Sequence, residues 1–138
     1  MFRIELDQPQ NRLTIGYSCY VSPDETQRCA EEIRVAVTKI KPGFRLLVDL
    51  TDLQLMEDSC APHIRNIMDM CNQKGVAEVV RIVPDPKRDI GLQIMSYFHY
   101  GGDVQILTRE SLADAANALA ALENGVKTDR SLATREHD

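Results

Sequence analysis

The sequence predicts one α/β domain, with a mixed β-sheet of about five strands and four helices in the order β-β-α-β-α-β-α-β-α. Two segments near the amino terminus alternate apolar and polar residues, as half-buried strands do. Two later segments are almost continuously apolar, which is typical of central strands covered on both faces. Amphipathic stretches between and after them have the periodicity and the boundaries of helices. A chain of 138 residues with 43% hydrophobic content is long enough to bury one core.

The chain begins with an expected antiparallel pair of strands. FRIELD (Phe2–Asp7) and RLTIGY (Arg12–Tyr17) both alternate, and QPQN between them supplies turn residues. Ser22 is followed directly by a proline and three residues later by Glu25, which predicts an N-cap, a first-turn proline and a capping box. We expect this helix to end at the Pro-Gly pair of residues 42–43.

A strand, helix, strand crossover is expected in the middle of the chain. Its strands are the apolar runs FRLLVDL (Phe44–Leu50) and EVVRIVP (Glu78–Pro84), and Gly75 ends the helix between them. The apolar stripe of that helix consists of Ile64, Ile67, Met68 and Cys71. Such a unit is typical of parallel strands joined by a right-handed crossover.

The carboxy-terminal part repeats the alternation. A third helix is expected to begin at residues 85–86, and the strand DVQILT (Asp103–Thr108) follows it. A last helix places Leu112, Ala115, Ala116, Leu119 and Leu122 on one face. Beyond Gly125 the sequence loses periodicity and is rich in charge, so we expect a domain over residues 1–124 and a disordered tail over 125–138.

The composition argues against several classes of function. A net charge of -5 leaves no basic surface of the kind that a phosphate backbone requires, so nucleic acid is not an expected partner. No leader-like or membrane-spanning apolar segment is visible, so we expect a cytoplasmic protein without a membrane partner. The four cysteines lack CxxC spacing, which indicates free thiols in a reducing compartment. Because no catalytic motif or metal-ligand cluster is found, we expect no enzyme activity, no metal and no cofactor.

The segment LLVDLTDLQLMEDSCAPHI (Leu46–Ile64) connects the first apolar strand to the next helix. It resembles the signature of STAS (sulphate transporter and anti-sigma factor antagonist) domains, in which a strand ends in an aspartate and an Asp-Ser-Ser-Gly type motif opens a helix. Asp49 matches the strand-end aspartate. Without a gap, the motif falls on Glu57, Asp58, Ser59 and Cys60, and Ser59 takes the place of the family's phosphoserine. The resemblance covers nearly all of the ordered chain and implies a STAS-like fold.

The resemblance also implies a function. In bacterial anti-sigma factor antagonists, that serine is phosphorylated by a partner kinase that is also the anti-sigma factor, and dephosphorylation restores binding. A regulatory signalling module is therefore implied, with an anti-sigma factor or a serine kinase-like protein as its partner. The motif departs from the family pattern: only the serine is kept, and Cys60 and Pro62 replace small family residues.

Ser59 allows two interpretations. As a phosphoacceptor, it would place a phosphate at the positive end of a helix dipole, near free backbone amides. As an N-cap, its oxygen would accept an amide hydrogen bond. Pro62 is tolerated only in the first helical turn, so the helix has to begin between about 58 and 61, with Asp58 or Ser59 at the cap. Glu57 and Asp58 would repel a phosphate or partly mimic one.

The expected partner-binding surface is the exposed junction between this strand and helix. Its candidate residues are Asp49, Met56, Glu57, Asp58, Cys60 and His63. Met56 and Met70 are the methionines most expected at the surface, and Cys60 has apolar packing as its simplest role because Glu57 and Asp58 oppose a thiolate. Three residues separate Cys60 from His63, but no third ligand accompanies them, so a metal site is not expected.

Two alternatives to a protein-interaction module remain open, and so does self-association. A small apolar ligand or lipid carrier would need a cavity near Met95, Phe98 and Leu107. A thiol redox sensor would need Cys60 to be exposed and acidic. The sequence also leaves open a homodimer, formed through an edge strand of the sheet.

Overall fold

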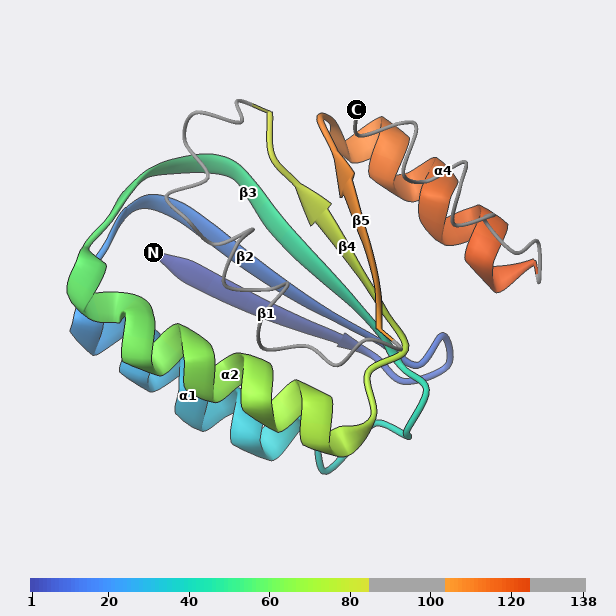
Figure 1. Cartoon of the computed structure of the whole chain (residues 1–138), viewed down its shortest axis with the longest axis horizontal. Coiled ribbons are helices and arrows are strands. Elements are labelled where there is room, and N and C mark those ends of the chain that lie inside the picture. Colours follow the sequence, from blue (N-terminus) through green and yellow to red (C-terminus); the bar gives the residue numbers. More distant parts are fainter. Residues whose placement is uncertain (85–103, 125–138) are drawn as a thin grey trace.

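The computed structural model of the chain describes residues 1–84 and 104–124, and it contains one five-stranded sheet with helices on both faces (Figure 1). In chain order the elements are β1 (Phe2–Asp7), β2 (Arg12–Val21), α1 (Pro23–Ala36), β3 (Arg45–Met56), the 3-10 turn η1 (Asp58–Cys60), α2 (Ala61–Lys74), β4 (Glu78–Ile82), β5 (Gln105–Arg109) and α4 (Leu112–Glu123). The strand order is β1-β2-β3-β4-β5; β1 is antiparallel to β2 and the other pairs are parallel. The predicted mixed α/β sheet is confirmed, while the predicted third helix falls outside the described residues.

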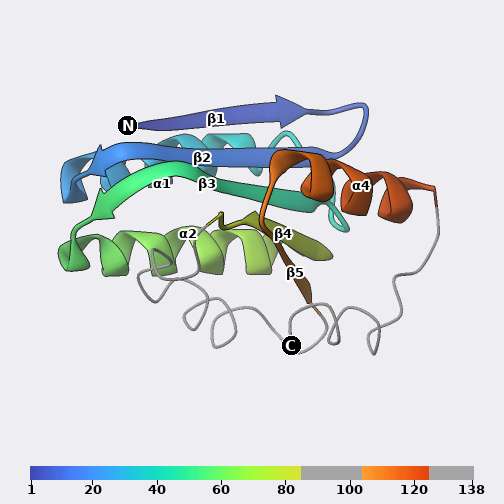
Figure 2. The ribbon, with the colours of Figure 1, turned by 90° about the horizontal axis from the view of Figure 1, so that it is seen from above.

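The helices form two unequal layers. α1 and α2 lie side by side on one face of the sheet, and α4 lies on the other face above β4 and β5 (Figures 1 and 2). Successive β3 residues pack against the two helix layers in turn, because side chains alternate along a strand. Leu46 packs with the α1 and α2 core, and Leu47 packs with the α4 core. Both faces of the central strands are therefore buried, as their continuous apolar runs predict.

Helix α1 begins as predicted and ends earlier than predicted. The Ser22 hydroxyl accepts a hydrogen bond from the Glu25 amide (3.3 Å), and the Glu25 carboxylate accepts one from the Ser22 amide (3.4 Å). The helix ends at Ala36, well before residues 42–43. The Thr38 hydroxyl donates a 2.6 Å hydrogen bond to the Val35 carbonyl, and such local bonds compete with the helical ladder.

Strand β3 is longer than predicted. It continues from Arg45 to Met56, past the expected end at Leu50, because residues 52–56 pair with the distal half of β2, Ser18–Val21. Pairing with β4 stops at Asp49, opposite Ile82. Asp49 therefore lies inside β3 and not at its end, and β2 and β3 continue beyond β4 as a two-stranded ribbon, called here the arm (residues 18–21 and 51–56).

The remaining helices follow the sequence pattern with one shift. α2 ends as predicted at Gly75, whose φ of +96° favours glycine. In α4, the buried residues are Ala115, Ala118 and Leu119. Ala116 is exposed and Leu112 is 60% exposed, so the predicted face was too wide. Among the described elements, α4 packs mainly on β4 and β5, and a helix with one packing surface buries a narrow stripe.

Candidate partner-binding site at the β3–α2 junction

The junction between β3 and α2 is anchored to the end of β2. The Val21 carbonyl accepts hydrogen bonds from the Glu57 amide (3.3 Å) and from the Cys60 thiol (3.6 Å). Cys60 is only 1% exposed and belongs to the core shared by α1 and α2. Its apolar packing role is confirmed, and its buried side chain anchors the turn η1 to this core.

Asp58 and Ser59 lie on the outer side of this anchored turn, and both are exposed. The prediction that one of them caps α2 is wrong. η1 occupies residues 58–60 and shifts the start of α2 to Ala61, which leaves Cys60 at the N-cap position without a side-chain cap. The Ser59 hydroxyl thus has no capping role in this structure.

An exposed apolar pair lies next to the turn, at the tip of the arm. Tyr20 is 48% exposed and Leu55 is 52% exposed, and they are direct neighbours across β2 and β3. The Tyr20 hydroxyl donates a hydrogen bond to the Glu57 carboxylate, which joins this pair to the acidic start of the turn. Sequence reasoning missed both residues, because each belongs to a strand pattern whose orientation depends on bulges in the β2–β3 pairing.

The other predicted binding residues differ in position. Met56 is 4% exposed and belongs to the core, so the expectation that it lies at the surface is wrong; the strand continues to Met56 and points its side chain toward the helices. Met70 is partly buried against the same core. His63 lies on the first turn of α2 and is half-buried. Glu57 is half-buried beside Tyr20.

Asp49 is engaged within the sheet. Its carboxylate accepts hydrogen bonds from Arg3 Nη2 (2.7 Å) and from the Thr51 amide (3.0 Å), as well as from the Thr51 hydroxyl. Arg3, Gly16 and Asp49 occupy the same row of β1, β2 and β3. A Cβ added to Gly16 would lie 2.7 Å from Arg3 Cζ, so the absence of a side chain there lets the guanidinium cross β2.

Two pKa values describe the electrostatics of the region. Burial acts to raise the pKa of Asp49, but the Thr51 and Arg3 hydrogen bonds outweigh it and lower this pKa below its ordinary value. Burial raises the pKa of the Cys60 thiol, and the charge of Glu57 raises it further. The requirements of the thiol-sensor hypothesis, an exposed and acidic Cys60, are therefore not met.

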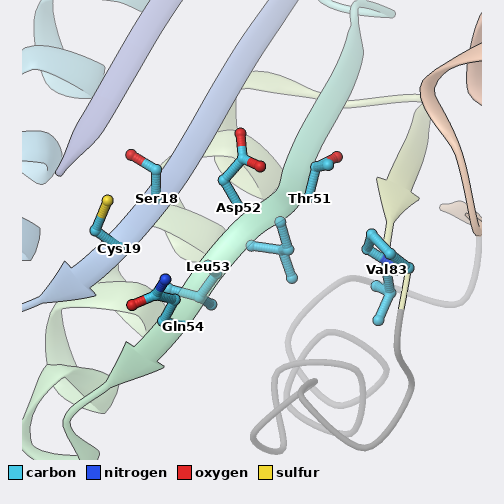
Figure 3. A pocket seen from close by; sticks show the side chains of 9 residues that line it. Ser18, Cys19, Thr51, Asp52, Leu53, Gln54 and Val83 are labelled. Carbon is cyan, nitrogen blue, oxygen red and sulfur yellow. The ribbon is translucent and has the colours of Figure 1, made fainter.

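A cavity of about 680 Å³ lies along the arm and the end of β4 (Figure 3). Its lining residues are Ser18, Cys19, Leu50, Thr51, Asp52, Leu53, Gln54, Val83 and Pro84. The apolar cavity expected near Met95, Phe98 and Leu107 cannot be placed, since Met95 and Phe98 lie outside the described residues; Leu107 is fully buried beneath α4.

Within residues 1–84 and 104–124, no group of three His, Cys, Asp or Glu side chains could hold a metal ion.

Comparison with solved structures places this fold among known ones. An uncharacterised protein of the DUF3478 family from Shewanella loihica PV-4, described as having a SpoIIAA-like fold, matches with a TM-score of 0.66 and 16% identity, over 86% of this chain and 93% of that chain. The anti-sigma factor antagonist SpoIIAA in its unphosphorylated form matches with a TM-score of 0.61 and 11% identity, over 87% and 98%. The Bacillus cell fate determinant SpoIIAA in its phosphorylated form matches with a TM-score of 0.59 and 11% identity, over 86% and 99%.

These structural similarities establish the fold. The chain has the STAS-like fold of the anti-sigma factor antagonists, and the predicted resemblance in fold is confirmed. No family model and no curated protein matches the sequence. Among the described helices, none is long and apolar enough to cross a membrane.

Proposed function

We propose that this protein is a regulatory protein-interaction module of the anti-sigma factor antagonist type, without enzyme activity of its own. The partner would be an anti-sigma factor or a serine kinase-like protein, and the binding surface would be the tip of the arm together with η1. The observation that carries the proposal is the position of Ser59. Ser59 is exposed on a turn that Cys60 anchors, four residues after Leu55 and two after Glu57, the residue that accepts the Tyr20 hydrogen bond.

This geometry suits a surface that is switched by a phosphate. Aromatic and aliphatic side chains exposed in a small patch supply the apolar centre of an interface, and polar residues around them form its rim. A phosphate on Ser59 adds close to two negative charges beside Asp58 and Glu57, which changes the charge of that rim without entering the core. SpoIIAA, whose fold this chain shares, has been solved in phosphorylated and unphosphorylated forms, which supports the same role for Ser59.

Mass spectrometry and variant binding test the proposal together. The protein purified from its native host is expected to carry a phosphate on Ser59, located by peptide fragmentation. Ser59→Asp is expected to release a partner that both the dephosphorylated wild type and Ser59→Ala retain in a pull-down. Asn66→Asp is the matched control, since it adds the same charge at an exposed position further along α2. Equal binding by all four proteins, with Ser59 unmodified, would contradict the switch.

A second pair of variants tests the surface independently of phosphorylation. Leu55→Asp places a charge in the apolar patch and is expected to abolish partner binding. Leu112→Asp is its control, because Leu112 is similarly exposed (60%) but lies on α4, on the other face of the sheet. Loss of binding in both variants, or in neither, would show that the arm is not the binding surface.

A further inference from the structure

β1 is an edge strand with an unusually regular backbone. All six of its residues pair in register with β2, and the strand contains no proline, glycine or bulge. Natural edge strands usually carry such features or charged side chains, because an open edge otherwise invites pairing with another strand; of these devices β1 has its charged residues Arg3, Glu5 and Asp7. The edge of β1 therefore has the geometry of a template for a further strand.

The hydrogen-bonding phase of β1 shows which groups face outward. Met1 and Ser18 exchange both backbone bonds, with the Met1 amine to the Ser18 carbonyl at 2.9 Å and the Ser18 amide to the Met1 carbonyl at 2.8 Å. In an antiparallel ladder such pairs alternate, so the amides and carbonyls of Phe2, Ile4 and Leu6 point away from β2. Within the described part of the chain, these outward groups have no backbone partner.

The sequence of β1 is complementary to itself in one register. A two-fold axis through Ile4 places two copies antiparallel, with Phe2 opposite Leu6 and Arg3 opposite Glu5 of the partner subunit. The outward groups of Phe2, Ile4 and Leu6 then form the hydrogen-bonded pairs, and Arg3 and Glu5 form the closer pairs, in which Glu5 of the partner subunit adds a second carboxylate beside the Arg3 side chain that already binds Asp49.

Neighbouring registers bring like charges together. An axis through Glu5 sets that carboxylate against its own copy, and an axis through Arg3 does the same for the guanidinium. An axis through Leu6 sets Glu5 against Asp7. Opposite charges across a strand pair stabilise it and like charges destabilise it, so the register centred on Ile4 is favoured.

The surface beside β1 adds apolar area to the same edge. A groove between β1 and α1 is lined by Leu6, Arg28, Glu31, Glu32, Val35, Ala36 and Lys39. Val35 is 56% exposed at this place, and the charged residues around it are of both signs. Because α1 lies beside β1, a two-fold axis through Ile4 brings the α1 helices of both copies to one face of the joined sheet.

We infer that two copies of this chain associate through β1, antiparallel and centred on Ile4, to form a continuous ten-stranded sheet (two sheets of five strands). We assign the partner strand to a second copy of the chain because, in that register, the charges of one β1 face opposite charges on the other. The outward amides and carbonyls of the two strands also face one another. The inference does not depend on the function proposed above, since it is argued from the residues of β1 alone.

Sedimentation equilibrium over a wide concentration range tests the association. The wild type is expected to pass from the 15.5 kDa monomer to a dimer. Glu5→Lys faces Arg3 of the partner subunit twice per dimer and is expected to raise the dissociation constant by about tenfold or more. Glu110→Lys makes the same charge change at an exposed site by the opposite edge and is expected to leave it unchanged. A monomer at every concentration, or equal weakening by both variants, would overturn the inference.

Cysteine cross-linking tests the register. In a Cys19→Ser background, which removes the exposed native thiol, Arg3→Cys and Glu5→Cys chains are mixed and oxidised. Facing Cα atoms about 4.5 Å apart permit a disulfide, so a mixed cross-linked dimer is expected. Glu5→Cys alone should not cross-link, because its two copies are offset along the strands and lie about 8 Å apart. A cross-link of Glu5→Cys to itself, or none in the mixture, would show that the proposed register is wrong.

Discussion

At the scale of single residues, the lack of a side chain at Gly16 allows Arg3 and Asp49 to bind across β2. Gly16 lies between Arg3 and Asp49 in the strand row, and its bare backbone is the surface over which the Arg3 guanidinium reaches the Asp49 carboxylate. Arg3 is half-exposed, so the ion pair itself contributes little stability. The role of Gly16 is therefore steric: it admits one particular arrangement of three strands.

We predict that Gly16→Val destabilises the fold by about 1–3 kcal/mol through overpacking against Arg3. The measurement is the free energy of unfolding in urea. The same substitution in an Arg3→Ala background should cost clearly less, because the side chain that it meets has been removed. An equal loss in free energy of unfolding in the two backgrounds would show that contact with Arg3 is not the reason for a glycine at position 16.

The low pKa of Asp49 predicts a pH dependence of stability. A carboxyl whose folded pKa lies below its unfolded value binds fewer protons in the folded state, so it stabilises the fold at higher pH. This contribution is complete above the ordinary value of 3.8 and is lost as the pH falls through the lower folded pKa.

Thermal unfolding of the wild type and of Asp49→Asn as a function of pH measures this contribution. The difference in Tm between the two proteins should be largest near neutral pH and should shrink below about pH 4. A difference that is constant down to strongly acidic pH would mean that the charge of Asp49 is not what stabilises the row.

At the scale of elements, α1 and α2 both follow a serine-containing segment but begin differently. α1 has a complete capping box at Ser22, whereas α2 follows a 3-10 turn and has no side-chain cap. What holds the start of α2 is the buried Cys60 and its bond to the Val21 carbonyl. Ser59 is thereby left exposed and is not needed for the local structure.

We predict that Ser22→Ala lowers the free energy of unfolding by about 1 kcal/mol, the usual cost of losing an N-cap. Ser59→Ala should change it by less than about 0.5 kcal/mol, as expected for a surface site without a structural bond. Chemical denaturation of both variants gives the comparison. A cost for Ser59→Ala as large as that for Ser22→Ala would restore the capping role and weaken the case for a modification site.

At the scale of the whole molecule, the carboxy-terminal end of α4 is bound to the first residues of β2 and β3. Arg45 Nη2 donates a 3.0 Å hydrogen bond to the Leu122 carbonyl, and Arg12 lies 3.5 Å from the Glu123 carboxylate. Both arginines come from the starts of central strands. The domain boundary at residue 124 stays a prediction, and these contacts offer a way to test it.

We predict that a chain ending at Asn124 keeps the Tm of the full-length protein, measured by circular dichroism. A chain ending at Ala121 lacks Leu122 and Glu123, and it should unfold at a clearly lower temperature because both contacts to the arginines are lost. A lower Tm for the chain that ends at Asn124 would show that residues 125–138 contribute to the fold.

The sequence by itself determined the class of fold and most of the elements. Alternation in residues 2–7, continuous apolar runs in β3 and β4, and the capping box at Ser22 are local or periodic signals, and they fix which segments pair and which face is buried. The motif that aligns Ser59 with a phosphoserine is also a property of the sequence. Its role as a switch stays a proposal.

Only the tertiary structure decided the shape of the candidate site. The arm exists because Ser18–Val21 and residues 52–56, which are more than thirty residues apart in the chain, pair with each other. This pairing contains register shifts that no local sequence pattern predicts. That pairing buries Met56, exposes Tyr20 and Leu55, and extends β3 beyond Asp49. A slip of one residue in a strand exchanges its buried and exposed faces, so the surface around Ser59 depends on register, which local sequence does not contain.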